Sequence, residues 1–407
     1  MGNSLRNKEV TGRGEQTGKS VPTATGRNVV KDIKTTAAVG KKTSSAGISQ
    51  STPGDNHGHK MTVEDFEILK VLGKGGFGKV MLVRKKDDPT NSVYAMKSLK
   101  KELLLKRTNK DKEIAHIETE RLVLQNVNSQ FVVHLFYAFQ TPHKLYMVMD
   151  YMAGGELFHW LKLQKRFKES RCRLYIAELS LGLDALHQKN IIHRDLKTEN
   201  ILLDAGGHIR IADFGLAKGG ITGYCEEGGT RTMCGTYEYM APEIVDNKTY
   251  GKAVDWWALG TLLFEFLYGL PPFYDSNVQR MYHKILHNPL VFPKTSEKNQ
   301  LDVSEHAKSI MRHLLDKNPS NRLCSKNGVE ELKSCKFFYN LEFNRVANLE
   351  YKPEFIPPAA KNESDVGNFD KDFTDLIPVD SLVTSHLTDT QIEATNFQGF
   401  TYEGDKM

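Results

Sequence analysis

The stretch IIHRDLKTENILLDAGGHIRIADFG, residues 191–215, constrains this chain more than any other part of it. Within it, two short apolar runs flank a pair of glycines, a pattern that predicts a β-hairpin over residues 201–211. Asn200 directly precedes this hairpin and Asp213 follows it, so the hairpin returns one side chain toward the other. Asp195 lies shortly before Asn200. The sequence therefore predicts two carboxylates and one amide at a single centre, an arrangement typical of an enzyme.

These residue types suit the transfer of a phosphoryl group. That reaction leaves a protein little covalent chemistry, so catalysis depends on positioning and on cations at the phosphate oxygens. Asp195 can accept the proton of an attacking hydroxyl, and Lys197 can meet the charge of the γ-phosphate. Asn200 and Asp213 supply the hard oxygen ligands that magnesium prefers. At these spacings the His-Arg-Asp triplet, Asn200 and the Asp-Phe-Gly triplet resemble the signature of protein kinases.

A glycine-rich motif joins two β-rich runs between residues 66 and 86. Glycines let backbone amides approach phosphates closely. A dinucleotide-binding turn is the alternative, but it requires a helix after the glycines and an acid about 20 residues later. Here a strand is predicted, and the cation Lys97 stands at that distance; it resembles the kinase lysine that binds the α- and β-phosphates. The residues implied to surround the nucleotide at this turn are Leu72, Gly73, Lys74, Gly75, Gly76, Phe77, Gly78, Lys79 and Val80.

Apolar residues recur at helical spacing over residues 111–127, opposite a charged face. The pattern alone leaves Glu113, Glu118 and Glu120 as candidate partners of the strand lysine. The run HIETERLVLQNV resembles the αC helix of the AGC group of kinases, and this resemblance selects Glu120. It also implies that His116 contacts a phosphate on the activation loop, although an ordinary exposed helix histidine remains the alternative.

The segment LYMVMDYMAGGELFHWL, residues 145–161, predicts a strand, a Gly-Gly turn and a helix, and it resembles the hinge of a kinase. The resemblance implies that the backbone from Asp150 to Met152 binds adenine and that Met149 is the gatekeeper. Glu156 is implied to bind the ribose or a substrate arginine. An acid at a helix start also favours the helix dipole, so Glu156 needs no further role.

The run TRTMCGTYEYMAPE within residues 218–243 resembles an AGC activation loop. Thr232 is the implied phosphorylation site, where a phosphate adds about −1.5 to −2 charge. Its implied partners are Arg194, Lys218 and His116. Two features depart from the family: the loop is longer at GYCEEGG, and Tyr237 stands where proline is commoner. Because of these departures, the resemblance does not predict the conformation of the unphosphorylated loop.

The C-terminal half has helical periodicity with polar turns. The resemblance makes Asp255 a buried anchor of the catalytic loop and pairs Glu243 with Arg322. It also implies an acidic surface that binds arginines of the substrate, N-terminal to the Ser or Thr that receives the phosphate. The residues implied for this surface are Glu156, Glu199 and Glu265.

Beyond residue 338, aromatic residues are spaced among acids, as in the C-terminal tail of AGC kinases. Phe369 and Phe373 are implied to cross the nucleotide pocket. Ser381 is the implied turn-motif phosphosite, but the usual following proline is absent, so Ser385 stays an alternative. The implied hydrophobic motif contains Phe397, Phe400, Thr401 and Tyr402, with Thr401 as its phosphosite. A solvated acidic tail without effect is the alternative.

The remaining expectations come from the length of apolar runs, the cysteine spacing and the charge of the chain. The 407 residues hold no apolar run long enough to span a membrane, and five cysteines lack metal-type spacing. We therefore expect an intracellular monomer in the cytosol or nucleus. Residues 1–60 carry ten Lys/Arg against four Asp/Glu and no aromatic residue. We expect residues 1–62 to be a disordered basic tail, and we infer no nucleic-acid binding from its charge.

The predicted fold class is α+β, a two-lobed protein-kinase fold with ATP and Mg²⁺ as cofactors. We expect a catalytic domain at residues 63–338, divided into a β-rich N-lobe (63–149), a hinge (150–153) and an α-rich C-lobe (154–338), and a tail at 339–407. The resemblance is to the branch of protein kinase B, the glucocorticoid-regulated kinases and the ribosomal-protein kinases.

That branch implies phosphate transfer to Ser/Thr in Arg-x-Arg-x-x-Ser/Thr sites. It also implies activation by phosphorylation of the loop and of the hydrophobic motif, with an upstream kinase similar to the phosphoinositide-dependent one. The alternative is a nucleotide-binding scaffold that signals by shape, which would require the loss of a catalytic group.

Overall fold

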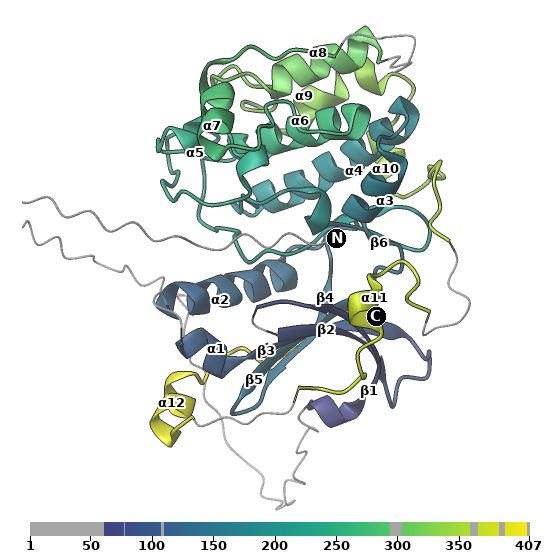
Figure 1. The fold of residues 1–407 in the computed structure, drawn as a ribbon, viewed down its shortest axis with the longest axis vertical. Helices are drawn as coiled ribbons and strands as arrows, with labels where there is room; N and C mark the ends of the chain where they lie inside the picture. Colours follow the sequence, from purple (N-terminus) through teal and green to yellow (C-terminus); the bar gives the residue numbers. More distant parts are fainter. Residues whose placement is uncertain are drawn as a thin grey trace, which may run out of the picture. The chain divides into compact units, whose positions relative to one another are not determined.

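The computed structural model describes residues 61–76, 78–106, 110–293, 303–358, 365–381 and 387–404. The predictions for residues 1–60, for Phe77 and for Ser385 lie outside these ranges. Figure 1 shows one lobe built around a β-sheet and a second lobe built of helices. This is the α+β, two-lobed arrangement expected from the sequence.

The N-lobe is an antiparallel six-stranded sheet in the order β1-β2-β3-β5-β4-β9. Its strands are β1 (Phe66–Lys74), β2 (Gly78–Lys85), β3 (Val93–Lys100), β4 (Leu135–Gln140), β5 (Lys144–Asp150) and β9 (Tyr402–Glu403). Helices α1 (Lys101–Leu105) and α2 (Lys110–Asn126) connect β3 to β4. The edge strand β9 comes from the C-terminal tail, so the tail completes the N-lobe sheet.

The glycine-rich turn between β1 and β2 depends on one glycine for a steric reason. A Cβ at Gly78 would lie 1.6 Å from the carbonyl oxygen of Ser98 on β3. No side chain can occupy that position, so glycine lets β2 begin directly against β3. The turn itself is closed by a hydrogen bond from Gly75 N to Gly78 O at 2.9 Å.

The C-lobe is helical and surrounds a central buried helix, α6. Its helices are α3 (Leu157–Gln164), α4 (Glu169–Gln188), α5 (Pro242–Val245), α6 (Ala253–Tyr268), α7 (Val278–His287), α8 (Glu305–Leu314), α9 (Val329–Lys333) and α10 (Phe343–Ala347). Nearly every residue of α6 is buried, which fits a helix that is apolar on all sides. It packs between α4 and α8 and ends at Gly269, whose φ of 84° is the left-handed conformation common after a helix.

A small sheet of β6 (Gly155–Glu156), β7 (Ile201–Leu203) and β8 (Ile209–Ile211) lies beside these helices. Strands β7 and β8 are the hairpin predicted from the sequence. In the tail, α11 (Lys371–Thr374) packs against β1, and α12 (Asp389–Ala394) lies beside the N-lobe (Figure 1). Among the described residues, no helix combines the length and the apolar character needed to cross a bilayer.

Candidate active site

The catalytic loop is held by a carboxylate of α6. The backbone N–H groups of His193 and Arg194 donate to Asp255, each at 2.9 Å, and His187 Nε2 lies 2.8 Å from Asp255 Oδ2. Burial alone would raise the pKa of Asp255, but the hydrogen bond with His187 and the backbone donors outweigh it and lower the pKa. These contacts fix Arg194 in a left-handed conformation, with φ at 68°. The anchoring role expected for Asp255 is confirmed.

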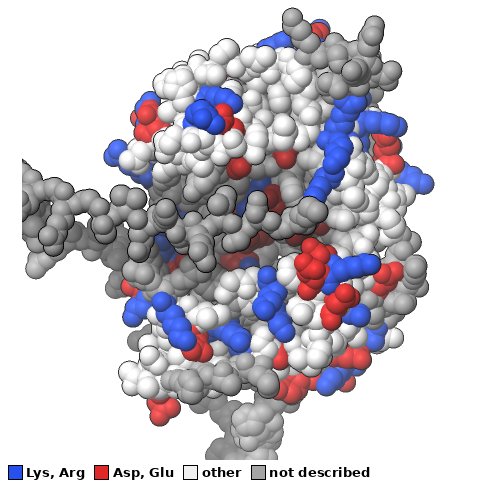
Figure 2. Space-filling view, viewed as in Figure 1, with Lys and Arg blue, Asp and Glu red and all other residues white. Residues whose placement is uncertain are grey.

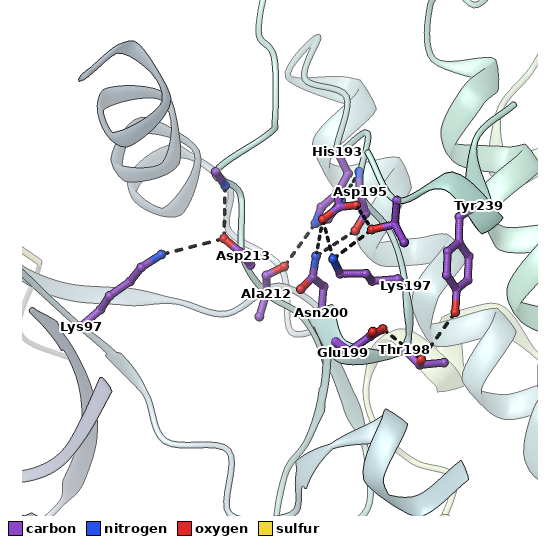
Figure 3. A network of polar contacts seen from close by, with 12 residues as sticks. Lys97, His193, Asp195, Lys197, Thr198, Glu199, Asn200, Ala212, Asp213 and Tyr239 are labelled. Atoms are coloured by element: carbon purple, nitrogen blue, oxygen red, sulfur yellow. Dashed lines mark hydrogen bonds and ion pairs between the residues drawn. The ribbon is translucent and has the colours of Figure 1, made fainter. Parts of the chain in front are cut away.

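Asp195 lies at the centre of a polar network (Figure 3). Thr236 Oγ1 donates to Asp195 Oδ1 at 2.7 Å, and Lys197 Nζ lies 3.0 Å from Asp195 Oδ2. Lys197 also donates to Thr236 Oγ1 at 3.0 Å. The side-chain amide of Asn200 donates to the backbone and the carboxylate of Asp195, at 2.8 and 3.2 Å. Asp195 is thus fixed in place with a cation beside it, as a proton acceptor for phosphoryl transfer requires.

The hairpin returns Asp213 to the catalytic loop as the sequence predicted. Ala212 N donates to Asn200 O at 2.8 Å, which places the residue before Asp213 against Asn200. His193 Nε2 contacts Ala212 O at 3.2 Å, while its Nδ1 accepts the N–H of Asp195 at 3.3 Å. One buried imidazole therefore links both sides of the site.

Lys97 on β3 projects toward the same site and pairs with Glu120 on α2. Their Nζ and Oε1 atoms are 2.6 Å apart, and Asp213 Oδ1 lies 3.8 Å from the same Nζ. Burial opposes the charge on Lys97, but Glu120 and Asp213 outweigh it and raise the pKa of the lysine. The structure thus selects Glu120, and not Glu113 or Glu118, as the partner.

Asn200 and Asp213 present oxygen donors suited to a magnesium ion. The side-chain nitrogen of Asn200 donates to Asp195, so the side-chain oxygen of Asn200 is the atom that could bind a metal ion. Burial would raise the pKa of Asp213, but Lys97 outweighs it and lowers that pKa, so the carboxylate stays ionised. The described residues contain no group of three or more His, Cys, Asp or Glu that could hold a metal alone. Two hard oxygen ligands that share an ion with phosphate oxygens fit Mg²⁺.

Apolar side chains around the glycine-rich turn form one cluster that includes Leu72, Val80, Ala95, Met149, Tyr151 and Phe369. Phe369 of the tail stacks on Tyr151 of the hinge, with ring centroids 5.8 Å apart. The tail therefore reaches the hinge at Phe369, while Phe373 lies on α11, which packs against β1. The passage of both residues across the nucleotide pocket stays a prediction. Gly73 and Lys74 pair with β2, and Gly75 and Gly76 are exposed.

The hinge places the side chain of Asp150 away from this cluster. Its carboxylate forms an ion pair with Arg210 and accepts the N–H of His134 at 2.8 Å. Asp150 N donates to His134 O at 3.1 Å, and Met152 O accepts from Gly155 N at 3.0 Å. These two bonds engage the N–H of Asp150 and the carbonyl of Met152. Lys79 was also expected near the nucleotide. Its Nζ contacts the tail, 3.5 Å from Val379 O.

The three acids expected to bind substrate arginines lie near the catalytic loop. Burial raises the pKa of Glu265 to about 7, and the charge of Glu199 adds to the shift. Burial and then Glu199 also raise the pKa of Glu156, so these acids interact with each other. Tyr239 donates to Glu265 Oε2 at 2.5 Å. Figure 2 shows acidic side chains in the hollow between the lobes.

Comparison with known sequences agrees with this geometry. The protein kinase domain matches residues 66–338, more than half of the chain. This chain belongs to the protein kinase family. The protein kinase C terminal domain matches residues 360–402, which places the kinase in the AGC group of serine/threonine kinases together with the relatives below.

Three relatives illustrate the similarity. The kinase is 45% identical to serine/threonine-protein kinase gad8 of Schizosaccharomyces pombe, over 84% of this chain and 56% of that protein. It is 44% identical to serine/threonine-protein kinase YPK1 of Saccharomyces cerevisiae, over 85% and 48%. It is also 44% identical to RAC-beta serine/threonine-protein kinase A of Xenopus laevis, over 78% and 62%. The matched region thus spans about half the length of the first two relatives.

The activation loop of the kinase has a defined path. Tyr250 donates to Thr232 O at 2.5 Å, and its hydroxyl also lies 3.5 Å from Arg194 Nη1. Burial lowers the pKa values of Lys218 and His116, and the charge of Arg194 acts in the same direction on both. Arg194 is thus near enough to act on both residues, and the lowered pKa leaves His116 mainly uncharged at neutral pH before any phosphate is added.

The longer part of the loop caps a helix. Gly223 O and Tyr224 O accept the N–H groups of Lys252 and Ala253 at the start of α6, at 3.1 and 2.9 Å. Tyr237, at the other departure from the family, packs edge-on against Tyr282 of α7, with centroids 5.9 Å apart. Both unusual features are thus packed against the C-lobe.

The hydrophobic motif of the kinase is docked between α2 and the sheet. Phe397 is 5% exposed and Phe400 2%. The side-chain amide of Gln140 on β4 donates to Phe397 O at 2.7 Å and accepts its N–H at 3.2 Å, while Arg121 on α2 donates to Phe400 O at 3.0 Å. Thr401 is exposed beside them. Ser381, the other expected tail phosphosite, lies against β5.

Sequence reasoning missed Thr236, Gln140 and Arg121. Thr236 belongs to the quoted Cys-Gly-Thr run, but nothing local indicates that its hydroxyl contacts Asp195. Gln140 and Arg121 contact residues more than 250 positions away, so no spacing pattern marks them. Glu243 and Arg322 form the expected buried pair, with hydrogen bonds of 2.6 and 2.9 Å.

Proposed function

We propose that this protein is a serine/threonine protein kinase that transfers the γ-phosphate of ATP to a hydroxyl of a protein substrate. The observation that carries the proposal is the position of Asp195. It lies against Lys197 and Thr236, next to Asn200. Asp213 of the same lobe faces the Lys97–Glu120 pair of the N-lobe. A proton acceptor, cations and hard oxygen donors thus converge. No group required for transfer is missing, so nothing favours the scaffold alternative.

Each residue has a distinct part in this reaction. Asp195 accepts the proton of the substrate hydroxyl while the oxygen of that hydroxyl bonds to the γ-phosphorus. The bond between the γ-phosphorus and the oxygen that leaves with ADP breaks. Lys197 meets the charge on the transferred phosphoryl group, and Thr236 keeps the Asp195 carboxylate in position. Lys97, oriented by Glu120, holds the α- and β-phosphates.

We assign the metal site to Mg²⁺, with Asn200 and Asp213 as its protein ligands. When bound, the ion neutralises charge on the phosphate oxygens and aligns the leaving group. The ionised carboxylate of Asp213 supports this choice, as does Asn200, whose amide nitrogen is engaged by Asp195. Gly73 to Gly78 and Val80 are proposed to surround the nucleotide, with the Asp150 and Met152 backbones at adenine.

The proposed substrates are Arg-x-Arg-x-x-Ser/Thr sites. Glu156, Glu199 and Glu265 support this preference because the charge of Glu199 acts on both of the other acids, which gathers negative charge near the catalytic loop. An arginine placed among them would relieve the repulsion and form charge-assisted hydrogen bonds, which are worth about 1.5–3 kcal/mol when partly desolvated. Exposed contacts would contribute far less.

Regulation is proposed to involve phosphorylation of Thr232, Ser381 and Thr401. Arg194 and Lys218 support the first site as cationic partners for a phosphate, whose charge would also favour the protonated form of His116. We further propose an upstream kinase similar to the phosphoinositide-dependent one, and a monomeric enzyme in the cytosol or nucleus.

The test is label transfer from γ-labelled ATP to an Arg-x-Arg-x-x-Ser peptide. Wild-type protein phosphorylated on Thr232 and Thr401 should label the serine, whereas Lys97→Met should lose activity by about 10²-fold or more. The same peptide with alanine at the acceptor position is the control. ATP binding without any label transfer, from fully phosphorylated protein, would favour the scaffold instead.

A further inference from the structure

The tail meets the N-lobe sheet at a second place, upstream of the hydrophobic motif. Asp380 accepts hydrogen bonds from Tyr146 Oη at 2.7 Å and from Ser98 Oγ at 3.3 Å, and it forms an ion pair with Lys144 Nζ at 2.7 Å. Its Oδ1 also accepts the N–H of Ser381 at 2.8 Å. The three side-chain partners lie on β3 and β5, so one tail carboxylate bridges two neighbouring strands. Figure 1 shows the tail running along this lobe after α11.

Lys144 needs this carboxylate because its side chain is only 3% exposed. A buried cation without a partner is strongly unfavourable. Burial lowers the pKa of Lys144, and Asp380 opposes that effect, while the nearby Lys100 and Lys79 add to it. Asp380 is therefore the acidic partner of Lys144 at a place where two further lysines act on its charge. Lys144 also donates to the carbonyl of Ser381, so the lysine holds both side chain and backbone of the tail.

We propose that Asp380 is a positioning residue whose carboxylate anchors the tail to the N-lobe sheet and so delivers the hydrophobic motif to its groove without a phosphate on Ser381. Phe397 follows Ser381 by sixteen positions in the sequence. An anchor at one end of so short a linker raises the effective concentration of the other end, to the millimolar range for flexible linkers. Docking of Phe397 and Phe400 then becomes an intramolecular step that the anchor favours.

The chemistry of the site favours Asp380 over a Ser381 phosphate as the anchor. The side chain already makes four contacts, one of them to a buried ammonium. The N–H of Ser381 is used by the same carboxylate. A phosphate on Ser381 would add charge to a place where a carboxylate is in position before any modification.

The experiment compares Asp380→Asn with Ser381→Ala, and uses Asp375→Asn, an exposed acid of the same tail, as the matched control. Hydrogen–deuterium exchange of peptides covering residues 397–404 reports docking, and kcat and KM for an arginine-containing peptide report the effect on the active site. We expect Asp380→Asn to speed exchange about tenfold or more and to lower kcat, with KM nearly unchanged. Ser381→Ala should keep exchange within about twofold of wild type, and Asp375→Asn should match it.

A further variant separates loss of the anchor from general destabilisation. Asp380→Asn leaves Lys144 buried without its partner, so the double variant Asp380→Asn/Lys144→Met should recover global stability while the tail remains unprotected. The proposal is overturned if Asp380→Asn keeps wild-type protection, or if Ser381→Ala loses as much protection as Asp380→Asn. It rests on the proposed kinase function only for the kcat readout. Exchange needs no catalysis, so a protein that responds as predicted but transfers no phosphate would refute the activity and leave the anchor standing.

Discussion

Removal of the two buried aromatic side chains of the tail, by Phe397→Ala/Phe400→Ala, should undock it and lower activity. Full burial of a phenylalanine contributes about 1.5–3 kcal/mol, so the pair supplies roughly 3–6 kcal/mol. Ordering the tail costs about 1–2 kcal/mol per residue, which offsets most of that gain and leaves docking marginal. Each 1.4 kcal/mol lost shifts the equilibrium about tenfold, so loss of even 3 kcal/mol moves a mainly docked tail to a mainly undocked one.

The loss should reach the active site through α2. The docked motif contacts Arg121 on the same helix that carries Glu120, the partner of Lys97. We therefore expect a lower kcat even when Thr232 is fully phosphorylated, together with faster exchange in β9, whose pairing with β4 includes the bond from Gly404 N to Phe136 O. Phosphates on Thr232 and Thr401 should for the same reason raise activity by more than the product of their separate effects.

The matched control is Tyr339→Ala, which removes an aromatic side chain that is 75% exposed. It should leave both exchange and activity as in the wild type. If the double phenylalanine variant retained wild-type activity with Thr232 fully phosphorylated, the tail would not position α2 and this explanation of regulation would have to be abandoned.

Three further outcomes follow from the site and the core. Asp213→Asn should weaken Mg²⁺-dependent ATP binding, measured by calorimetry with and without the ion; unchanged binding would remove Asp213 from the metal site. Because burial raises the pKa of Glu265 to about 7, the side chain gains its charge as pH rises through 7. KM for an arginine-containing peptide should then fall about tenfold from pH 6 to pH 8, and Glu265→Gln should abolish that trend. Glu243→Gln leaves Arg322 buried without its charge partner and should lower the free energy of unfolding by about 3–5 kcal/mol in denaturant titrations, whereas a loss below 1 kcal/mol would show that the pair is dispensable.

Local patterns predicted the parts of the site that lie close together in sequence. The hairpin between Asn200 and Asp213 follows from two apolar runs around glycines, and its geometry fixes where Asp213 lies. The choice of Glu120 among three glutamates needed the family resemblance, because helical periodicity alone places several acids on one helix. The structure then showed its physical basis, since only Glu120 reaches Lys97 with a 2.6 Å ion pair among the described residues.

Contacts between distant segments could not be predicted in this way. Thr236 reaches Asp195 because the activation loop folds back over the catalytic loop, and Asp380 reaches Lys144 because the tail after α11 lies against β5. Neither pair leaves a periodic signal in the sequence. The side chain of Asp150 illustrates the same limit: its ion pair with Arg210 depends on how the hinge meets β8.

The most direct test of the central claim measures ATP binding and phosphate transfer on the same Asp195→Asn protein. Asparagine retains the shape of the side chain but cannot accept the substrate proton as a carboxylate does. We predict that ATP affinity stays near the wild-type value while turnover of an arginine-containing serine peptide falls by about 10²-fold or more, the usual scale for loss of a general base. Wild-type turnover in this variant would contradict the assignment of Asp195 and, with it, the proposal that this chain acts as a kinase through this site.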